Sequence, residues 1–459
     1  MSLGLLLDIS RQSFRALDAA MNVAGQNVAN AETEGYSRRR LDLTSLEVYR
    51  GGSYQGKAGL VGAGVGIASF DRMRDSMLDH ARWEARGTLH YADEQERVMR
   101  SVEALFPTGD ASLQESVDQF WNAWSDLADH PTDVGVRHSL KGRAEALVSR
   151  LNAIDTGVDR IRRETNLAIE EKVTEANNLI SLIGSLNAQI AHAQYGGHSD
   201  FAAMDRRDIA LQRLSEMVPA RFEEQIDGST SVYIRGLQVV TQANTMLLSA
   251  DLTGSSPQVT IGEPSIGFPS GLDTGEIGAL LGPVYDDINN TRDKLNALTD
   301  TLVTEVNTLH QAGYGIDGTN GRDFFDPTGL AAGTIALSAD VADPINIAAS
   351  GDSAAQGDNS NALAIHDLRY ALVMSGNSQN LSDYAVDIVS EIGSGVAAAR
   401  ARATGAEASV SGLDALADGV RKVNIDDEMV GLIKLQQAYA ASARVLSTTD
   451  RMFEILLSI

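Results

Sequence analysis

The feature that most constrains this fold is a heptad pattern at the C-terminal end of the chain, in residues 425–459. Apolar residues recur there in steps of three and four, and no glycine or proline follows Gly431. The stripe is Met429, Leu432, Gln436, Tyr439, Ala443, Leu446, Asp450, Phe453 and Leu457, in which Gln436 and Asp450 are the polar exceptions. So narrow an apolar stripe predicts a helix that needs a second helix to cover it.

The first thirty residues offer a matching helix. Leu7, Phe14, Met21 and Val28 follow one strict seven-residue repeat, and Ser10, Leu17 and Ala24 follow the complementary one. We therefore predict that the two ends meet in space, and that identical neighbours bury the remaining apolar flanks in a head-to-tail contact that builds a tube. The residues predicted to carry assembly are Leu7, Phe14, Leu17, Met21 and Val28, with Leu432, Gln436, Tyr439, Ala443, Leu446, Phe453 and Leu457. The alternative is two ordinary surface helices of a globular domain.

Composition narrows the class of protein. A chain of 459 residues is too long for one core and should divide into two to four domains. The net charge of −25 argues against nucleic acid or an anionic membrane as a partner, and no apolar run is long enough for membrane insertion. The N-terminus has no basic segment before its short apolar run, so we expect no cleavable signal peptide.

Periodicity predicts a mainly α fold with a small β insertion. We expect short strands in 41–68, helices in 71–130, a long helical rod in 140–195, strands in 219–272, a helix in 276–312 antiparallel to the rod, and a helix in 381–420. Ile335, Leu337, Ile345 and Ile347 suggest short strand-like pieces. Three domains follow: paired terminal heptad helices (1–35 with 425–459), a long antiparallel coiled-coil or helical-bundle domain (36–218 with 273–424), and an inserted, solvent-facing small β domain (219–272).

The sequence contains only weak matches to motifs for nucleotide binding, metal binding or catalysis. Residues 51–57 match the start of a phosphate-binding loop, but Ala58 replaces the Ser or Thr that would bind magnesium, so a glycine-rich hairpin is the better interpretation. Residues 317–321 hint at a calcium loop but lack its spacing, and we expect a turn. The eight histidines form no metal-binding motif, and there is no cysteine. We expect no catalytic residues, metal or cofactor, and therefore no enzyme.

Two strings are more specific. Asn27, Asn30, Thr33, Gly35 and Tyr36 lie in the run 27–39, which closely resembles a motif of the axial proteins of the bacterial flagellum. Residues 436–450 are similar to the C-terminal signature of the same proteins. Residues 205–208, 274–281, 310–314 and 323–325 resemble the hook-associated protein 1 family in particular, which forms the hook–filament junction.

The resemblance implies a structural adaptor layer between hook and filament, secreted through the flagellum's own channel to an extracellular position. It implies these partners: copies of itself, the hook protein, the second junction protein, the flagellar export apparatus, and a cytoplasmic export chaperone that holds the C-terminal helix. The central insertion is small, so an outer domain found in some members should be absent. Two alternatives remain: another axial subunit, such as the hook protein or second junction protein, or a secreted coiled-coil adhesin or effector whose β domain binds a host ligand.

Overall fold

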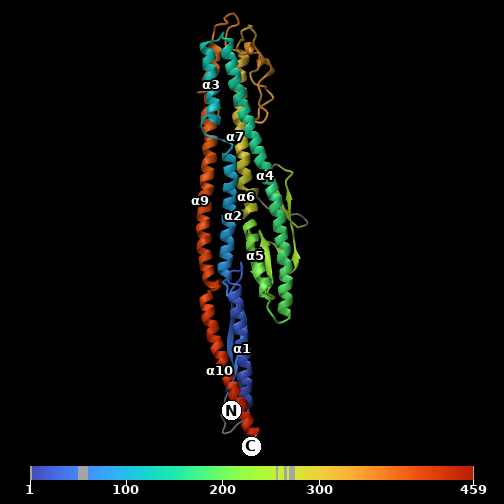
Figure 1. Cartoon of the computed structure of the whole chain (residues 1–459). Helices are drawn as coiled ribbons and strands as arrows, with labels where there is room; N and C mark the ends of the chain where they lie inside the picture. Colours follow the sequence, from blue (N-terminus) through green and yellow to red (C-terminus); the bar gives the residue numbers. More distant parts are fainter. Residues whose placement is uncertain (1–2, 50–59, 255–256, 263–265, 268–273, 458–459) are drawn as a thin grey trace.

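The chain forms an elongated molecule in which both termini lie at the same end (Figure 1). The structure is a computed structural model, and it describes residues 3–49, 60–254, 257–262, 266–267 and 274–457. The helices of the rod are α2 (Ser76–Glu103), α3 (Leu113–Asp129), α4 (Val134–Tyr195), α5 (Phe201–Met217), α6 (Glu276–Leu281), α7 (Pro283–Ala312), α8 (Ser360–Asp367) and α9 (Leu381–Arg421). The terminal helices are α1 (Leu3–Ala29) and α10 (Ile425–Leu457).

The long rod helix is confirmed. Helix α4 contains 62 residues and is therefore about 90 Å long. Asp133 caps its first turn by accepting hydrogen bonds from the amides of Gly135 and Val136, and Gly196 follows its last residue. The segment of α6 and α7 runs antiparallel to it, as predicted, because Asp155 pairs with Arg292 of α7 at 3.4 Å, while Lys172, farther along α4, pairs with the earlier Glu276 of α6.

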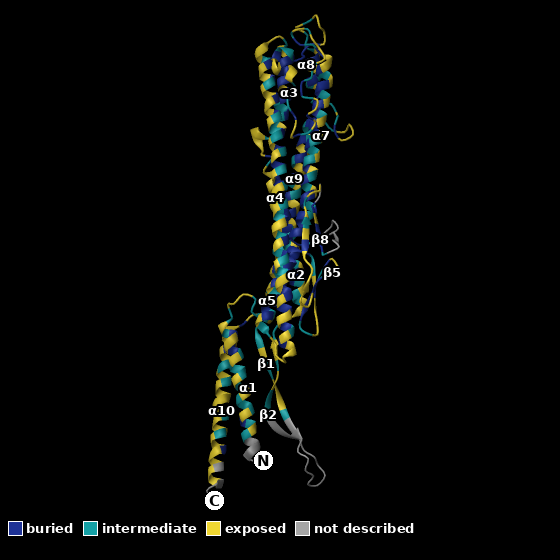
Figure 2. Cartoon of the chain, turned by 90° about the vertical axis from the view of Figure 1, so that its right-hand side faces the viewer, coloured by how far each residue is buried: buried dark blue, intermediate teal, exposed yellow. Residues whose placement is uncertain are grey.

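One apolar core runs through the rod and the strands. At the end of the rod farthest from the termini, α3 packs Phe120 and Trp124 against Phe324, and Phe120 also contacts Phe325 and Trp121. The prediction that residues 113–127 face a core is therefore confirmed. Figure 2 shows buried residues along the centre of the rod and mostly exposed or half-buried ones in the terminal helices.

The β insertion consists of two small antiparallel sheets. The first has the order β3 (Ala220–Glu224), β4 (Thr230–Ile234), β5 (Leu237–Thr241) and β6 (Asn244–Thr245). The second contains β7 (Leu248–Asp251), β8 (Gln258–Ile261) and β9 (Ile266–Gly267). Val232, Val240 and Val259 belong to the same buried cluster as the rod helices, so the strands share their core with the rod.

Two segments differ from expectation. Residues 39–72 form two long paired strands, β1 (Arg39–Tyr49) and β2 (Leu60–Arg72), rather than short strands and turns. The phosphate-loop-like residues 51–58 lie outside the described residues.

The predicted strand-like pieces after α7 are wrong. Among the described residues, 317–360 form 3-10 turns (Ala339–Ala342 and Pro344–Asn346) and isolated bridges such as Phe325 with Leu337. Ile345 lies in the second of these turns, and the bridge at Leu337 does not extend into a ladder through Phe325, because the side chain of Asn307 bonds the amide and the carbonyl of Phe325.

Candidate assembly interface

The helices from the two ends of the chain pack side by side (Figure 1). On α1 the side facing α10 follows the predicted repeat, with Ser10 and Ala24 buried and Leu7, Phe14, Leu17, Met21 and Val28 half-buried. The rings of Phe14 and Tyr439 meet edge to face, with centroids 4.8 Å apart. The structure thus pairs the two ends of one chain, while any contact between chains remains a prediction.

The side of α10 that faces α1 is rotated slightly from the predicted stripe. Its least exposed residues are Glu428, Leu432, Leu435, Ser442, Leu446 and Thr449. Gln436 and Ala443, which we expected in this seam, are exposed, because Leu435 and Ser442 occupy the corresponding positions one residue earlier. The side chains of Phe453 and Leu457 lie outside the described residues. Leu432 and Leu446 are shared by both stripes, and Tyr439, although 41% exposed, contacts Phe14 with its ring.

Apolar residues of α10 outside the seam are exposed. Ile433 is 51% exposed, and Met429, Val430, Val445 and Met452 are exposed as well. At 100° per residue, Val430 and Ile433 lie on the side of α10 away from α1, and Met429, Val445 and Met452 lie on the two flanks of the seam. We call Met429, Val430, Ile433, Val445 and Met452 the outer α10 face.

Helix α1 has a second buried side, which packs on the β1–β2 hairpin. Ala16 is buried there, and Gly64 of β2 lies directly against α1. A side chain at Gly64 would come within 3.3 Å of the Cα of Ile9, and its φ of +105° also favours glycine. The hairpin is thereby held against the terminal helices.

Asn27 joins α1 to the hairpin. Its side-chain oxygen accepts hydrogen bonds from the Tyr36 hydroxyl at 2.8 Å and from the Arg39 amide at 2.9 Å. Its side-chain nitrogen donates to the Arg39 carbonyl at 2.9 Å. Burial raises the pKa of Tyr36, which keeps the hydroxyl protonated as a donor. Asn27 therefore holds the end of α1 to Tyr36 and Arg39 through three hydrogen bonds. Its position in the sequence motif did not reveal this role.

The rest of the motif builds the turn after α1. Asn30 donates to the Gln26 carbonyl at 2.9 Å and so satisfies the end of the helix, as expected of a capping residue. Thr33 donates to Asn30, at 3.4 Å. Gly35 has a φ of +74°, and a side chain there would come within 2.4 Å of Ile209 on α5. Gly35 therefore forms a turn that a residue with a side chain would strain.

We call residues 30–38 and 421–424, which connect the terminal helices to the rod, the neck. Arg38 in the neck pairs with Glu428 of α10 at 2.7 Å. Directly beside it, Arg72 of β2 bridges Asp205 at 2.8 Å and Asp208 at 2.9 Å on α5. Burial alone would lower the pKa of Arg72, but Asp208 and Asp205 raise it overall.

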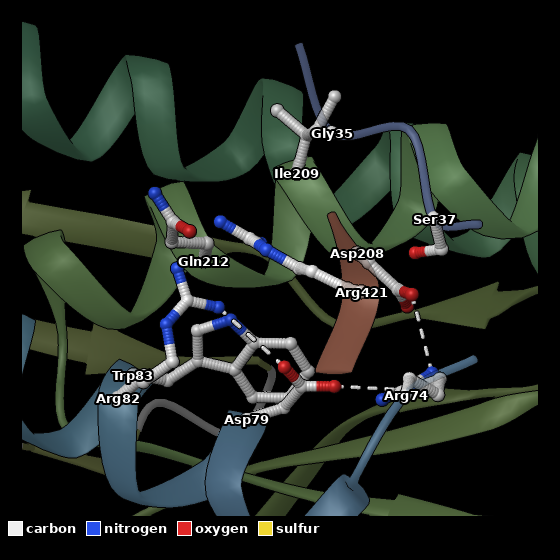
Figure 3. Close-up of a pocket in the computed structure, with 10 residues that line it drawn as sticks. All are labelled: Gly35, Ser37, Arg74, Asp79, Arg82, Trp83, Asp208, Ile209, Gln212 and Arg421. Carbon is white, nitrogen blue, oxygen red and sulfur yellow. Dashed lines mark hydrogen bonds and ion pairs between the residues drawn. The ribbon is translucent and has the colours of Figure 1, made fainter. Parts of the chain in front are cut away.

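A small polar cavity lies at the same level (Figure 3). Its volume is about 40 Å³, enough for one or more waters. Arg74 pairs with Asp79 at 3.0 Å and with Asp208 at 3.1 Å along its wall, and Arg421 of α9 lines it as well. Within the described residues, the apolar core of the rod includes no residue of α1, β1, β2 or α10. The terminal helices are therefore joined to the rod by ion pairs and hydrogen bonds.

Chemical sites are not apparent in the part of the chain that the structure describes. No group of three or more His, Cys, Asp or Glu side chains there could hold a metal ion. No described helix has the length and apolar character needed to cross a bilayer. Asp317 accepts a hydrogen bond from the Thr319 amide at 3.1 Å and pairs with Arg322, as in a turn.

Comparison with known proteins gives a consistent picture. Residues 99–325 match the family model of the flagellar hook-associated protein FlgK helical domain, and residues 422–459 match that of the flagellar basal body rod FlgEFG protein C-terminal region. Flagellar hook-associated protein 1 of Bacillus subtilis (strain 168) is 26% identical, over 98% of this chain and 97% of its own length. The protein of that name from Escherichia coli (strain K12) is 23% identical, over 99% of both chains.

A solved structure agrees in fold. The flagellar hook junction protein FlgK from Burkholderia pseudomallei superposes with a TM-score of 0.65 at 14% identity. The match covers 74% of this chain and 99% of that one.

Proposed function

Because this chain belongs to the flagellar hook-associated protein 1 family, we propose that it joins hook to filament as a ring-like adaptor layer assembled through its terminal helices. It is a structural protein of the bacterial flagellum. The matched helical-domain model and the relatives carry the name of hook-associated protein 1 rather than that of the hook protein or the second junction protein.

One observation carries the proposed mode of assembly. Helix α10 packs on α1 and leaves the residues of the outer α10 face exposed. Exposed apolar residues along a terminal helix are typical of a surface that another chain covers. We propose that they contact a different surface of the next copy, in a heterologous contact that propagates around a ring or tube.

The remaining partners are those that the family resemblance implies. We propose that the chain contacts the hook protein on one side and the second junction protein on the other. A cytoplasmic export chaperone would cover the outer α10 face before assembly, since exposed apolar surface promotes aggregation. The flagellar export apparatus would then secrete the chain to the extracellular flagellum. We infer a structural rather than an enzymatic role, because the family is a structural one.

The test separates contact between copies from pairing within one chain. Ile433→Asp changes an exposed residue of the outer α10 face, so the α1–α10 pair should persist while assembly fails. Leu446→Asp changes a half-buried seam residue and should disrupt both. Leu167→Asp on α4, which alters a residue 64% exposed in the rod, is the matched control.

The assay is motility and filament counting by electron microscopy in cells that carry each variant, with immunoblots of the secreted fraction. We expect folded Ile433→Asp subunits without filaments, and normal filaments with Leu167→Asp. The immunoblots distinguish failed assembly of secreted subunits from failed export, which loss of the chaperone contact would cause. Normal motile filaments on Ile433→Asp cells would refute the role of this face.

A further inference from the structure

We propose that the chain carries a binding groove for an uncharged oligosaccharide where the C-terminal end of α4 meets the first β-sheet. The groove has a volume of about 690 Å³, within the range of about 300–1,000 Å³ usual for small-molecule sites. Its walls come from the last turn of α4, the β3–β4 turn, and strands β4 and β5. The inference does not depend on the proposed role in the flagellum.

The polar lining suits a ligand rich in hydroxyl groups. The groove is lined by four glutamines: Gln194, Gln225, Gln238 and Gln242. Each side-chain amide can both donate and accept hydrogen bonds, and so can the hydroxyl groups of a sugar. Within the described residues, the side-chain amides of Gln194 and Gln238 have no hydrogen-bond partner and are therefore available to a ligand.

The charge of the lining selects an uncharged ligand. None of the described residues of the groove is Lys, Arg or His, and its one charged side chain is Asp227. A carboxylate in a chain with a net charge of −25 disfavours phosphorylated or carboxylated ligands. This distinguishes a neutral sugar from a nucleotide or an acidic glycan.

Two tyrosines supply apolar ring surface. Tyr195 is 81% exposed at the end of α4, and Tyr233 on β4 is half-buried in the same groove. A tyrosine ring has apolar faces and a polar tip, so it can pack on the C–H face of a sugar while its hydroxyl remains hydrated. The side-chain amides can thus bond the hydroxyl groups of a pyranose, and the tyrosine rings can pack on its C–H face.

The rim of the groove is held in place from beneath. Gln242 has a φ of +51° in the tight turn between β5 and β6, a conformation that favours Asn or Gly. The backbone carbonyl of Gln242 accepts a hydrogen bond from the side chain of Asn187, a fully buried residue of α4, at 3.1 Å. The side-chain amide of Gln242 donates a hydrogen bond to the Asp227 carboxylate at 3.1 Å. Asn187 also binds the amide and the carbonyl of Thr230. The strained rim is thus fixed before any ligand arrives.

The experiment uses the purified full chain and three neutral probes, maltohexaose, cellohexaose and chitohexaose, in saturation-transfer NMR followed by calorimetric titration. We expect saturable binding of at least one probe with a dissociation constant of about 1 mM or tighter. Tyr195→Ala and Gln238→Ala should each weaken that binding by about fivefold or more. Tyr370→Ala, an exposed tyrosine between α8 and α9, is the matched control and should bind as the parent does.

Each result decides the proposal. Absence of saturable binding by all three probes overturns it, as does equal binding by the parent and Tyr195→Ala. Thermal melts that match the parent would show that a loss in Tyr195→Ala is not unfolding. Filament formation is not measured, so failure here leaves the proposed assembly role intact.

Discussion

The buried His310 makes the stability of the rod depend on pH. Its ring is fully buried in α7, with Nδ1 2.8 Å from the Arg322 carbonyl and Nε2 accepting from the Ala348 amide at 2.9 Å. The neutral ring satisfies both partners when Nδ1 carries the proton. A second proton, on Nε2, would face the Ala348 N–H and place an unpaired charge in the core, beside Trp124 and Phe324.

Burial accordingly lowers the pKa of His310 from 6.5 to about 4. The unfolded chain therefore binds this proton near pH 6.5 and the folded chain only near pH 4, so the stabilisation is complete above pH 6.5 and is lost as the pH falls toward 4. At about 1.4 kcal/mol per pH unit, the loss amounts to roughly 3 kcal/mol.

The measurement is urea unfolding followed by tryptophan fluorescence, at pH values between 7 and 4.5, for the parent and His310→Gln. Many carboxylates also titrate in this range, so the informative quantity is the difference in unfolding free energy between the two proteins. We expect His310→Gln to be less stable at pH 7 and this deficit to shrink as the pH falls. His198→Gln, which replaces an exposed histidine, should follow the parent throughout. Parallel curves for the parent and His310→Gln would refute the argument.

Four further outcomes follow from the terminal helices and the neck. Asn27→Ala should cost about 2–3 kcal/mol, for three lost hydrogen bonds, and should speed hydrogen exchange in α1 but not in α4. Gly35→Ala should cost at least about 1–2 kcal/mol for its left-handed backbone, seen as a lower melting temperature; an unchanged one would contradict this. Arg72→Met removes one cationic partner from Asp205 and Asp208, which keep Arg39 and Arg74, and should lower the unfolding free energy by about 1–3 kcal/mol, checked by urea titration against the parent. Limited proteolysis with mass spectrometry should remove 3–29 and 425–457 before cutting the rod, because they lie outside its core; equal rates would count against that separation.

Much of the fold could be predicted because its helices are long. The three-four spacing runs from Leu140 to Ala168 and, after a polar stretch at Lys172 and Glu175, resumes at Leu179. It indicates a long helix, and α4 is continuous across that span. Pairing of the two ends followed from two stripes that each lacked a partner. The exact seam on α10 did not, since Leu435 and Gln436 both fit a three-four spacing and only packing against α1 selects between them.

The neck and the loops after α7 could not be predicted for a different reason. Arg72 and Asp208 are far apart in sequence, and a single chain with abundant arginine and carboxylate residues offers many equivalent pairings. The motif at 205–208 was a visible signal, but its partners were not. After α7, Asn307 satisfies backbone groups that strands would otherwise pair, and one side chain of that kind leaves no periodic pattern.

The meeting of α1 with α10 also has a kinetic consequence. These helices stand at opposite ends of the sequence, so an unfolded chain would have to close its largest possible loop to pair them. Once α2 has packed along α9, the folded rod holds the start of α10 and the end of α1 close to the neck. The effective concentration of each terminal helix near the other is then high. The terminal pair should therefore form last and open first, leaving both helices available to partners while the rod is already complete.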